Sequence, residues 1–327
     1  MMKLESKRIK ELAFTVGFDL CGITTPEIIP EAKESYQKWL ANNYHGEMEW
    51  LNRNIERRTN PSLLIENAKS VIMLGLNYYQ PNILEIPEEH GRVSRYARGK
   101  DYHKVIKKKT ENLIYKMMSI IEPGLDVNDK ELREKSREYF RWFVDYGPFV
   151  ERSYAAKAGL GFIGKNGMLI NRQFGSWIFL AEIISSLEIT IDDEVNVNHG
   201  RCGTCTKCID ACPTSAIIED GILDATKCIS YLTIEKPSDI SEELKSKIGK
   251  LIFGCDICQE VCPHNNRAIE TKHKEFLSAK GVGEFLNAKT ILKLQSMEDF
   301  LKLTAGTPLV RPKLDNLQRN AKIVLGE

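Results

Sequence analysis

The sequence has no continuous run of eighteen apolar residues, so it predicts no membrane-spanning helix. Its 46 basic and 45 acidic side chains leave a formal net charge of +1, which excludes a strong overall attraction to nucleic acid. The stretch MMKLESKRIKELAF is amphipathic but lacks an apolar core and a twin-arginine pair. We therefore expect no export signal and a cytoplasmic protein, and any affinity for RNA must come from a local basic patch.

What the sequence does have is cysteine: there are nine, and eight of them lie between positions 202 and 262. Cys21 stands apart in the apolar stretch FDLCGITT, where we expect it to fill the core. The run C-x2-C-x2-C-x3-C-P that begins at Cys202 is typical of bacterial ferredoxins, in which the fourth cysteine binds the other of two clusters. In an intracellular chain such spacing favours metal binding over disulfides.

A second run, C-x2-C-x3-C-P from Cys255, has only three cysteines, and two cubane clusters need eight thiolates. Cys228, in DATKCISYL, supplies the eighth. We therefore assign one [4Fe–4S] cluster to Cys202, Cys205, Cys208 and Cys262, and the other to Cys212, Cys228, Cys255 and Cys258. Tetrahedral zinc is the alternative, but it requires independent ligand pairs, which the ferredoxin spacing does not favour.

Apolar patterns alternate between helical and strand periods over the first part of the chain, which predicts an α/β domain over residues 1–195. We expect helices at 3–16, 31–42, 102–121 and 151–158, and strands at 18–24, 70–79 and 139–148, in GMLIN and in SWIFLAEIISSLEI. The polar stretch TIDDEVNVNHG predicts a boundary, so the cysteine region occupies 196–267. The remainder, 268–327, has a mainly helical pattern, with SMEDFLKL as an N-capped helix.

The stretch GLGFIGKN, residues 159–166, matches two phosphate-binding patterns, G-x-G-x-x-G and G-x4-G-K. Both motifs need a strand before the glycines and a helix after them. Here the pattern before the glycines is helical and the pattern after them is that of a strand. We interpret the stretch as a helix C-terminus followed by a turn, which can still approach a large ligand because glycine has no side chain.

Several stretches together resemble the epoxyqueuosine reductase family: SRYARGKDYHKV, VDYGPFVERSYAAKAGLGFIGKNGMLI, GSWIFLAEI and the cysteine layout. The resemblance runs from about residue 8 to 325. It implies an α/β cobalamin-binding domain, an α+β ferredoxin-like domain with two [4Fe–4S] clusters, and a helical C-terminal segment. It also implies that the clusters pass electrons to cobalt, which removes the epoxide oxygen of epoxyqueuosine at the tRNA wobble position.

The implied partners are a tRNA with a GUN-type anticodon and an external low-potential electron donor, with the chain as a monomer. Many members of the family carry a longer C-terminal helical-repeat extension. Because this sequence ends at Glu327, we expect part of that possible tRNA-contact surface to be absent or replaced. Two other classes remain as alternatives. A corrinoid reductive dehalogenase is usually exported with a twin-arginine signal, and a plain iron–sulfur electron carrier would not need the motifs of the first domain.

The resemblance implies that Asp145, in VDYGP, is the proton donor. Partial burial beneath a corrin ring should raise its pKa, as a general acid requires; the alternative is an aspartate that starts a turn. The implied cobalamin contacts are Arg58, Ser94, Asp145, Lys165, Asn166, Leu169, Ser230 and Asp256. Surface charges or helix caps are the alternative roles for several of these. We expect His103, in DYHKV, to be structural or a phosphate contact and not a cobalt ligand.

Residues 92–109 contain eight basic residues against one acid, Asp101, with Tyr96 and Tyr102 interleaved. This composition suits a phosphate backbone with stacked bases, although a solvated helix face is the alternative. Lys236 and Arg267 flank the cysteine region and could also meet RNA. We therefore predict nucleic-acid contacts at Arg95, Arg98, Lys100 and Lys236.

Overall fold

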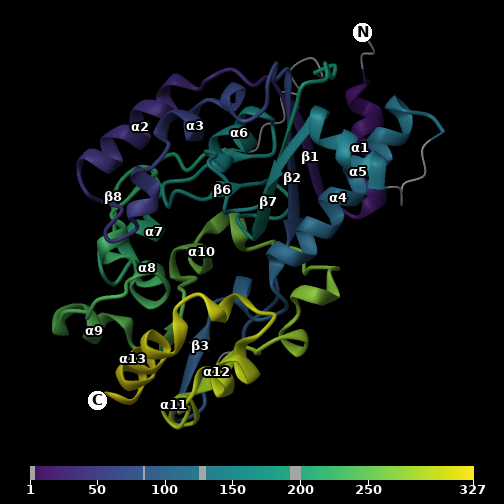
Figure 1. Ribbon diagram of the computed structural model, residues 1–327. Helices are drawn as coiled ribbons and strands as arrows, with labels where there is room; N and C mark the ends of the chain where they lie inside the picture. Colours follow the sequence, from purple (N-terminus) through teal and green to yellow (C-terminus); the bar gives the residue numbers. More distant parts are fainter. Residues whose placement is uncertain (1–3, 84, 125–129, 192–199) are drawn as a thin grey trace.

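The computed structural model describes residues 4–83, 85–124, 130–191 and 200–327 (Figure 1). The α-helices are α1 Ser6–Val16, α2 Pro30–Ala41, α3 Ile55–Thr59, α4 Tyr102–Ile121, α5 Lys130–Tyr139, α6 Glu151–Lys157, α7 Lys207–Asp210, α8 Ile229–Ile234, α9 Glu242–Ile248, α10 Ile257–Glu260, α11 Ala288–Leu292, α12 Met297–Thr304 and α13 Lys313–Leu325. The strands are β1 Leu20–Thr24, β2 Ser70–Asn77, β3 His90–Val93, β4 Phe140–Phe143, β5 Phe162–Ile163, β6 Leu169–Ile170, β7 Ile178–Ser185, β8 Ile217–Glu219, β9 Ile222–Leu223, β10 Leu251–Phe253 and β11 Phe285–Asn287.

The central sheet has the strand order β1-β2-β7-β4, and each neighbouring pair is antiparallel. Strands β2 and β7 pair over eight residues, from Ser70 opposite Ser185 to Asn77 opposite Ile178. Every residue of β2 is buried, as predicted for a continuous apolar run covered on both faces. Cys21 on β1 is 8% exposed, which confirms its place in the core.

Helices α1, α4 and α5 cover one face of this sheet, and α6 covers the other (Figure 1). Helix α4 has the predicted bounds, and the Asp101 side chain caps it by accepting a hydrogen bond from the His103 amide at 3.0 Å. Its apolar stripe, which includes Ile106, Leu113 and Met117, packs into the core. The sheet and α4 together fix the position of the loops that carry the site.

A second sheet, in the order β10-β3-β11, combines strands from all three predicted segments. Strand β3 pairs in parallel with β10 and antiparallel with β11. Helix α13 packs on this sheet, and the predicted cap of α12 is confirmed, because the Ser296 hydroxyl accepts a hydrogen bond from the Asp299 amide at 3.1 Å. The stretch that predicts the 195/196 boundary lies largely within residues 192–199, outside the described residues, so the division into three domains stays a prediction.

The glycine-rich stretch after α6 forms a turn and a short hairpin. Gly159 has a φ of +74° directly after the helix, and β5 then pairs with β6. A Cβ on Gly161 would lie 2.4 Å from the Ile170 carbonyl oxygen, so the hairpin requires glycine there. The order helix–turn–strand is confirmed, and it is the reverse of the order that a phosphate-binding loop requires. Within the described residues, no helix combines the length and the apolar character needed to cross a bilayer.

Candidate iron–sulfur and cofactor site

The first predicted thiol set, Cys202, Cys205, Cys208 and Cys262, lines a cavity of about 160 Å³. A water molecule occupies about 30 Å³ in the liquid, so the cavity has room for a group of several atoms. Among the described residues, no three His, Cys, Asp or Glu side chains converge closely enough to share a single metal ion. The Lys165 amide points at the Cys202 sulfur at 3.4 Å. Such N–H···S contacts stabilise cluster-bound thiolates.

The second predicted set, Cys212, Cys228, Cys255 and Cys258, is also brought together. Burial, together with the nearby Cys228 and Cys212, raises the pKa of Cys255 to about 12. Burial likewise raises the pKa of Cys258, with Cys255 and Cys228 adding to the effect. The Ala216 amide lies 3.3 Å from the Cys212 sulfur, and Ser230 donates a hydrogen bond to Cys228. A metal cluster would hold these thiols in the ionised form, which the protein alone disfavours.

The two thiol sets are adjacent and differ in their surroundings. Cys208 of the first set adds to the raised pKa of Cys258 in the second, and helices α7 and α10 pack together. The second set faces the first part of the chain: the Asn166 side-chain amide donates to the Cys258 carbonyl at 3.4 Å. Gly254, with a φ of +72°, has no room for a Cβ because Ser94 Oγ would lie 2.4 Å away. This close approach seats Ser94 beside Cys255.

Several predicted cofactor residues gather on this side of the second thiol set. Ser94 and Asn166 are 4% and 6% exposed. Ser94 Oγ and Arg58 Nε are buried without a hydrogen-bond partner within the described part of the chain. The Arg58 guanidinium also donates to the Gly147 carbonyl at 3.3 Å, which ties it to the turn that carries Asp145. Buried polar atoms without partners are costly, so these two atoms are suited to a polar ligand.

Three other predicted cofactor residues have side chains that are engaged or enclosed by the protein. Lys165 lines the cavity of the first thiol set, and its ammonium pairs with Asp220 at 3.3 Å. Leu169 is 3% exposed and packs in the core beneath α6. The Asp256 carboxylate accepts hydrogen bonds from the Arg95 amide at 2.9 Å and guanidinium at 3.2 Å. The cofactor contacts expected at Leu169 and Asp256 stay predictions, and in this structure the carboxylate of Asp256 is already engaged by Arg95.

Asp145 occupies a turn after β4 with a φ of +62°, a left-handed conformation that is unusual for a residue with a side chain. Its amide donates to Glu151 Oε1 at 2.7 Å, and its carboxylate accepts from the Tyr102 hydroxyl. Its Oδ2 also lies 3.5 Å from His103 Nε2, and the side chain is 62% exposed. The strained turn therefore presents a carboxylate to open space while neighbouring groups hold it in place.

The pKa of Asp145 lies below its usual value in this structure, and the rise expected beneath a corrin ring stays a prediction. Burial raises the pKa of this carboxyl, but the hydrogen bonds from His103 and Tyr102 outweigh burial and hold the pKa below its usual value. For His103, burial lowers the pKa, while Asp101 and Asp145 raise it more strongly, to about 9. The proton of the Asp145–His103 pair therefore resides on the imidazole at neutral pH.

Sequence reasoning missed His103, Tyr102 and Glu151 as functional residues. The Tyr102 ring stacks between His103 and Phe179, with centroid distances of 4.0 and 4.3 Å. Nδ1 of His103 lies 2.8 Å from Asp101 and its Nε2 faces Asp145, so both ring nitrogens have carboxylate neighbours. The sequence feature that could have indicated Tyr102 and His103 is DYHKV, in which a histidine lies two positions after a helix-capping aspartate.

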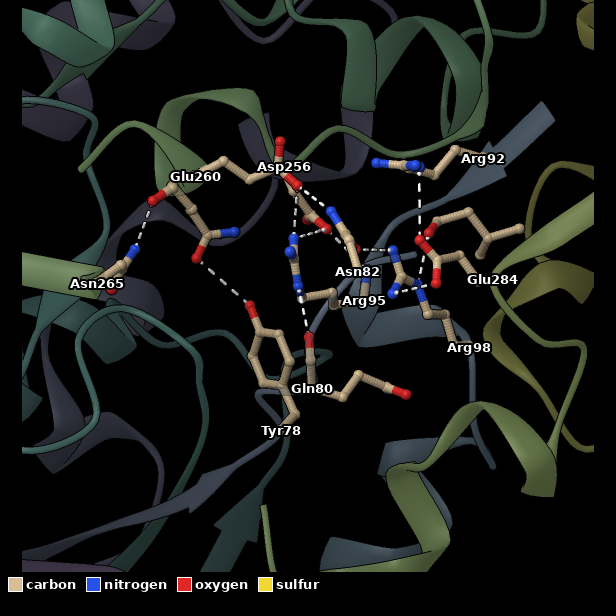
Figure 2. Close-up of polar contacts among 12 residues, drawn as sticks. Tyr78, Gln80, Asn82, Arg92, Arg95, Arg98, Asp256, Glu260, Asn265 and Glu284 are labelled. Carbon is tan, nitrogen blue, oxygen red and sulfur yellow. Dashed lines mark hydrogen bonds and ion pairs between the residues drawn. The ribbon is translucent and has the colours of Figure 1, made fainter. Parts of the chain in front are cut away.

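The predicted RNA contact at Arg95 is wrong because its side chain is in the interior. Arg95 is 5% exposed, and its Nη1 lies 2.8 Å from Glu260 and 3.2 Å from Asp256. The guanidinium also stacks over Trp177, 4.6 Å from the ring centroid. Figure 2 shows Arg95 between Asp256 above and Gln80 below. A side chain enclosed in this way cannot reach a phosphate.

Arg98 is also interior, with an exposure of 0%. Its Nη1 lies 3.5 Å from Glu284, which also meets Arg92 at 3.6 Å (Figure 2). The prediction of an RNA contact at Arg98 is therefore wrong, and Tyr102, which is 8% exposed, is not available for base stacking. Lys236 pairs with Glu47 at 2.7 Å. The exposed basic residues of the stretch are Lys100, Lys104, Lys107 and Lys108.

Comparison with known proteins agrees with this geometry. Residues 201–265 match the family model “4Fe-4S double cluster binding domain”, and residues 58–145 match “Epoxyqueuosine reductase QueG, DUF1730”. An epoxyqueuosine reductase from Leadbetterella byssophila is 40% identical over 323 residues, which cover 99% of each chain.

Solved structures give the same result. The epoxyqueuosine reductase of Streptococcus thermophilus superposes with a TM-score of 0.82 at 30% identity, covering 98% of this chain and 80% of that one. A crystal structure of epoxyqueuosine reductase with an epoxyqueuosine-modified tRNA-Tyr stem loop gives the same TM-score, identity and coverage.

The fold and the eight thiols define an iron–sulfur oxidoreductase in which a two-cluster region adjoins an α/β domain. The extent of the match makes the family definite: the chain belongs to the epoxyqueuosine reductases. Its cofactors are two [4Fe–4S] clusters and cobalamin. The predicted family, fold class and cofactors are confirmed, and the reductive dehalogenase and electron-carrier alternatives are set aside.

Proposed function

We propose that this chain reduces epoxyqueuosine to queuosine at the wobble position of a tRNA with a GUN-type anticodon, acting in the cytoplasm as a monomer. The observation that carries the proposal is that Tyr96 lies near both the second thiol set and the Asp145 turn. A Cβ on Gly254, next to Cys255, would lie 3.4 Å from Tyr96 Cε1, and the Tyr96 ring centroid is 6.1 Å from that of Tyr102, whose hydroxyl donates to Asp145. An electron that leaves the cluster bound by the second thiol set would then arrive close to Asp145, the proposed acid.

The residues around this space fit a large cofactor with a polar rim. Ser94 Oγ and Arg58 Nε are buried polar atoms without a partner among the described residues, and Ser230 lies against Cys228. These three residues, with Asn166, would hold cobalamin. When bound, the clusters supply single electrons and cobalamin supplies the cobalt at which the epoxide oxygen is removed. Electrons would enter from an external low-potential donor at the first thiol set, which lines an open cavity.

Asp145 is the proposed proton donor. Opening the epoxide to an alkene consumes two electrons and two protons and releases water, so a proton must reach the departing oxygen. The imidazolium of His103, with its Nε2 3.5 Å from Asp145 Oδ2, can protonate that carboxylate. A bound cofactor and substrate exclude water from Asp145, which favours its neutral form and readies it as an acid.

The exposed lysines at the start of α4 provide the proposed contact for the tRNA backbone. Lys100 and Lys104 flank Tyr102 and His103, the two residues that hold Asp145. Phosphates bound there would bring the anticodon loop to the acid, and the modified base would leave its stack to enter the site.

The direct test is Asp145→Ala, assayed anaerobically on an epoxyqueuosine-containing tRNA stem loop. We expect turnover to fall by roughly 10²- to 10⁴-fold, the usual contribution of a general acid, with iron content and bound cobalamin unchanged. Asp315→Ala, which removes an exposed carboxylate from α13, is the matched control and should keep full activity. If the Asp145→Ala variant kept wild-type turnover, the assignment of Asp145 as the acid would be wrong.

The assignment of the eighth thiolate has its own test. Cys228→Ala should disrupt one cluster and reduce the iron content from about eight to about four atoms per chain. Cys21→Ala, a change at a buried thiol outside both sets, should leave the iron content unchanged. An unaltered iron content in the Cys228 variant would contradict the ligand assignment.

A further inference from the structure

Two exposed aromatic side chains lie beside the turn that carries Asp145. Tyr146, the next residue in the chain, is 62% exposed, and Trp50, in the short helical segment Glu49–Asn52, is 38% exposed. In the described part of the chain, the remaining exposed aromatic side chain is Phe14 on α1. A single exposed ring needs no explanation, but exposed apolar groups that gather beside a functional residue indicate a binding surface.

The Arg58 side chain joins the two aromatic residues through their backbones. Its Nη2 donates to the Trp50 carbonyl at 3.4 Å, and its Nη1 donates to the Gly147 carbonyl at 3.3 Å. Gly147 directly follows Tyr146. Because both contacts come from one planar guanidinium group, the segment that carries Trp50 and the turn that carries Tyr146 lie next to each other.

The turn itself keeps the Tyr146 ring outside the core. Val144 before it and Phe149 after it are 0% and 6% exposed, so both ends of the turn are anchored in the interior. The Tyr146 amide donates to the Val144 carbonyl at 2.6 Å, and a Cβ on Gly147 would lie 2.4 Å from the Cβ of Phe143. The backbone between the two anchors is therefore tight, and the Tyr146 ring stays at the surface.

The Tyr146 ring also faces the histidine that contacts the proposed acid. Its centroid lies 6.0 Å from that of His103, and the two ring planes differ by 34°. Nε2 of His103 is 3.5 Å from Asp145 Oδ2, and both of these side chains are partly open to solvent. A planar group that approaches Asp145 from solvent therefore meets the open Tyr146 ring.

The Trp50 ring is held by a cation from the C-terminal segment. The Arg311 guanidinium lies 5.1 Å from the ring centroid, a distance typical of a cation–π contact. The same guanidinium donates to both carboxylate oxygens of Glu235 at 2.9–3.1 Å. Glu235 ends α8, the helix that begins after Cys228. The indole is thus fixed between two parts of the protein and keeps an exposed surface.

We propose that Tyr146 and Trp50 form a stacking platform for unpaired bases of the substrate RNA that flank the modified base, an inference that rests on the proposed action on tRNA. Bases of an anticodon loop lie outside a duplex, and proteins bind such bases by stacking them on aromatic side chains. The platform supplies the open ring surface that Tyr102, which is 8% exposed, does not offer.

Stacking also suits the range of proposed substrates. Anticodons of the GUN type share their first two bases and differ in the third. A π-face is present on every base, so a stack tolerates a change of sequence that a hydrogen-bonded contact would reject. The exposed Lys100 and Lys104 would then bind the RNA backbone, while the platform binds the bases.

The first measurement is equilibrium binding of a labelled epoxyqueuosine stem loop to cofactor-loaded protein, without a reductant so that no turnover occurs. Tyr146→Ala should weaken binding by roughly 5- to 150-fold, the usual contribution of one base–aromatic stack. Tyr146→Phe keeps the ring and should bind like the wild type. Phe14→Ala, which removes an exposed ring from α1, is the matched control and should leave binding unchanged. Wild-type affinity in both Tyr146→Ala and Trp50→Ala would overturn the platform.

The salt dependence of binding separates a stack from a phosphate contact. Loss of a phosphate contact reduces the slope of log affinity against log salt by about one unit. Loss of an uncharged ring lowers the affinity at every salt concentration and keeps the slope. We therefore expect the wild-type slope in Tyr146→Ala and Trp50→Ala. A reduced slope in both variants would mean that the rings only support charged groups, and the platform would be wrong.

A fluorescent base reports stacking directly. Two stem loops carry 2-aminopurine, whose emission falls on stacking, on one or the other side of the modified base. At saturation we expect at least one of them to emit less in complex with the wild type than with the double variant Trp50→Ala/Tyr146→Ala. Equal emission in both stem loops would contradict the proposal.

The state of each variant is checked by its iron content, bound cobalamin and thermal unfolding. Both rings are exposed, so we expect all three to match the wild type. If Trp50→Ala lost cobalamin but kept its affinity for the stem loop, Trp50 would belong to the cofactor site and the two-ring platform would be refuted.

Failure of the proposed function has a different signature. In that case the wild-type protein itself leaves the epoxyqueuosine stem loop unconverted under reducing conditions. If only the platform is wrong, the wild type converts the stem loop, and Tyr146→Ala and Trp50→Ala bind and convert it equally well.

Discussion

The network around Arg95 and Arg98 and the acidic series of Asp145, Glu151 and Glu182 are both enclosed by the fold, but their charges are balanced differently. Each buried arginine meets at least one carboxylate, from Asp256, Glu260 or Glu284, at 2.8–3.5 Å. In the acidic series, three carboxyl groups lie close together and Glu182 has no partner in the described structure.

The difference indicates two kinds of role. A network in which charges are paired and hydrogen-bonded fixes the relative position of segments that are distant in sequence: Arg95 and Asp256 are separated by 161 positions. In the acidic series the pKa values of Glu151 and Glu182 are raised and that of Asp145 is lowered, and perturbed carboxyl groups of this kind are typical of functional sites. The arginine network thus joins residues 92–98 to residues 256–284.

The largest expected effect on stability comes from breaking the paired network. Arg98→Met removes one of the two arginines that pair with the buried Glu284 and leaves Arg92 in place, so it should cost about 3 kcal/mol in the free energy of unfolding. Urea unfolding measures this. The double variant Arg98→Met/Glu284→Leu should recover much of the loss, and if it is no more stable than the single variant, the coupling between the two side chains is absent.

The opposite change is expected in the acidic series. Glu182→Met replaces an unpartnered buried carboxyl by an apolar side chain of similar length, and should raise the free energy of unfolding by about 1–3 kcal/mol. A Glu182→Met protein that is less stable than the wild type would mean that the carboxyl group has a stabilising partner after all.

The acidic series also predicts how stability varies with pH. The pKa of Glu151 rises from 4.5 to about 8 on folding, so the folded chain keeps a proton that the unfolded chain has lost. The stability contribution is therefore present below about pH 4.5 and is lost as the pH rises to about 8. Thermal unfolding of Glu151→Gln should show a flatter pH dependence over this window, and curves parallel to those of the wild type would contradict the raised pKa.

The smallest effect is expected at the exposed lysines that replace the buried arginines as candidate RNA contacts. Lys104→Ala should weaken tRNA binding and reduce the slope of log affinity against log salt by about one unit, as expected for the loss of one phosphate contact. Lys130→Ala, whose side chain is 89% exposed on α5, serves as the control. An unchanged slope in the Lys104 variant would remove α4 from the RNA-binding surface.

The sequence was sufficient to predict an element or a ligand set when the residues that determine it lie close together in the chain. Helix α4 has the predicted bounds because its apolar period and its cap lie within one stretch, and the two thiol sets follow from spacing and from the need for eight ligands. It was insufficient where a residue depends on a distant partner. Arg95 and Arg98 look like RNA contacts because their carboxylates come more than 160 positions later.

The prediction for Asp145 was limited in the same way, by its dependence on residues from another element. Asp145 was found through a family motif, but the sign of its pKa shift depends on Tyr102 and His103, which belong to another element. Glu182 stands in the strand IFLAEIIS with nothing nearby to mark it. Only the register of β7 against β2 and β4 reveals that it shares the face covered by α6.

The small sheet β10-β3-β11 limits how early the protein can complete its fold during synthesis on the ribosome. Strand β3 ends at Val93, yet its antiparallel partner β11 is complete only at Asn287. At a translation speed of about 5–20 residues per second, β11 is synthesised about 10–40 s after β3, so β3 lacks this partner strand during that time. The sheet that joins residues 90–93, 251–253 and 285–287 is therefore completed only after synthesis has passed Asn287.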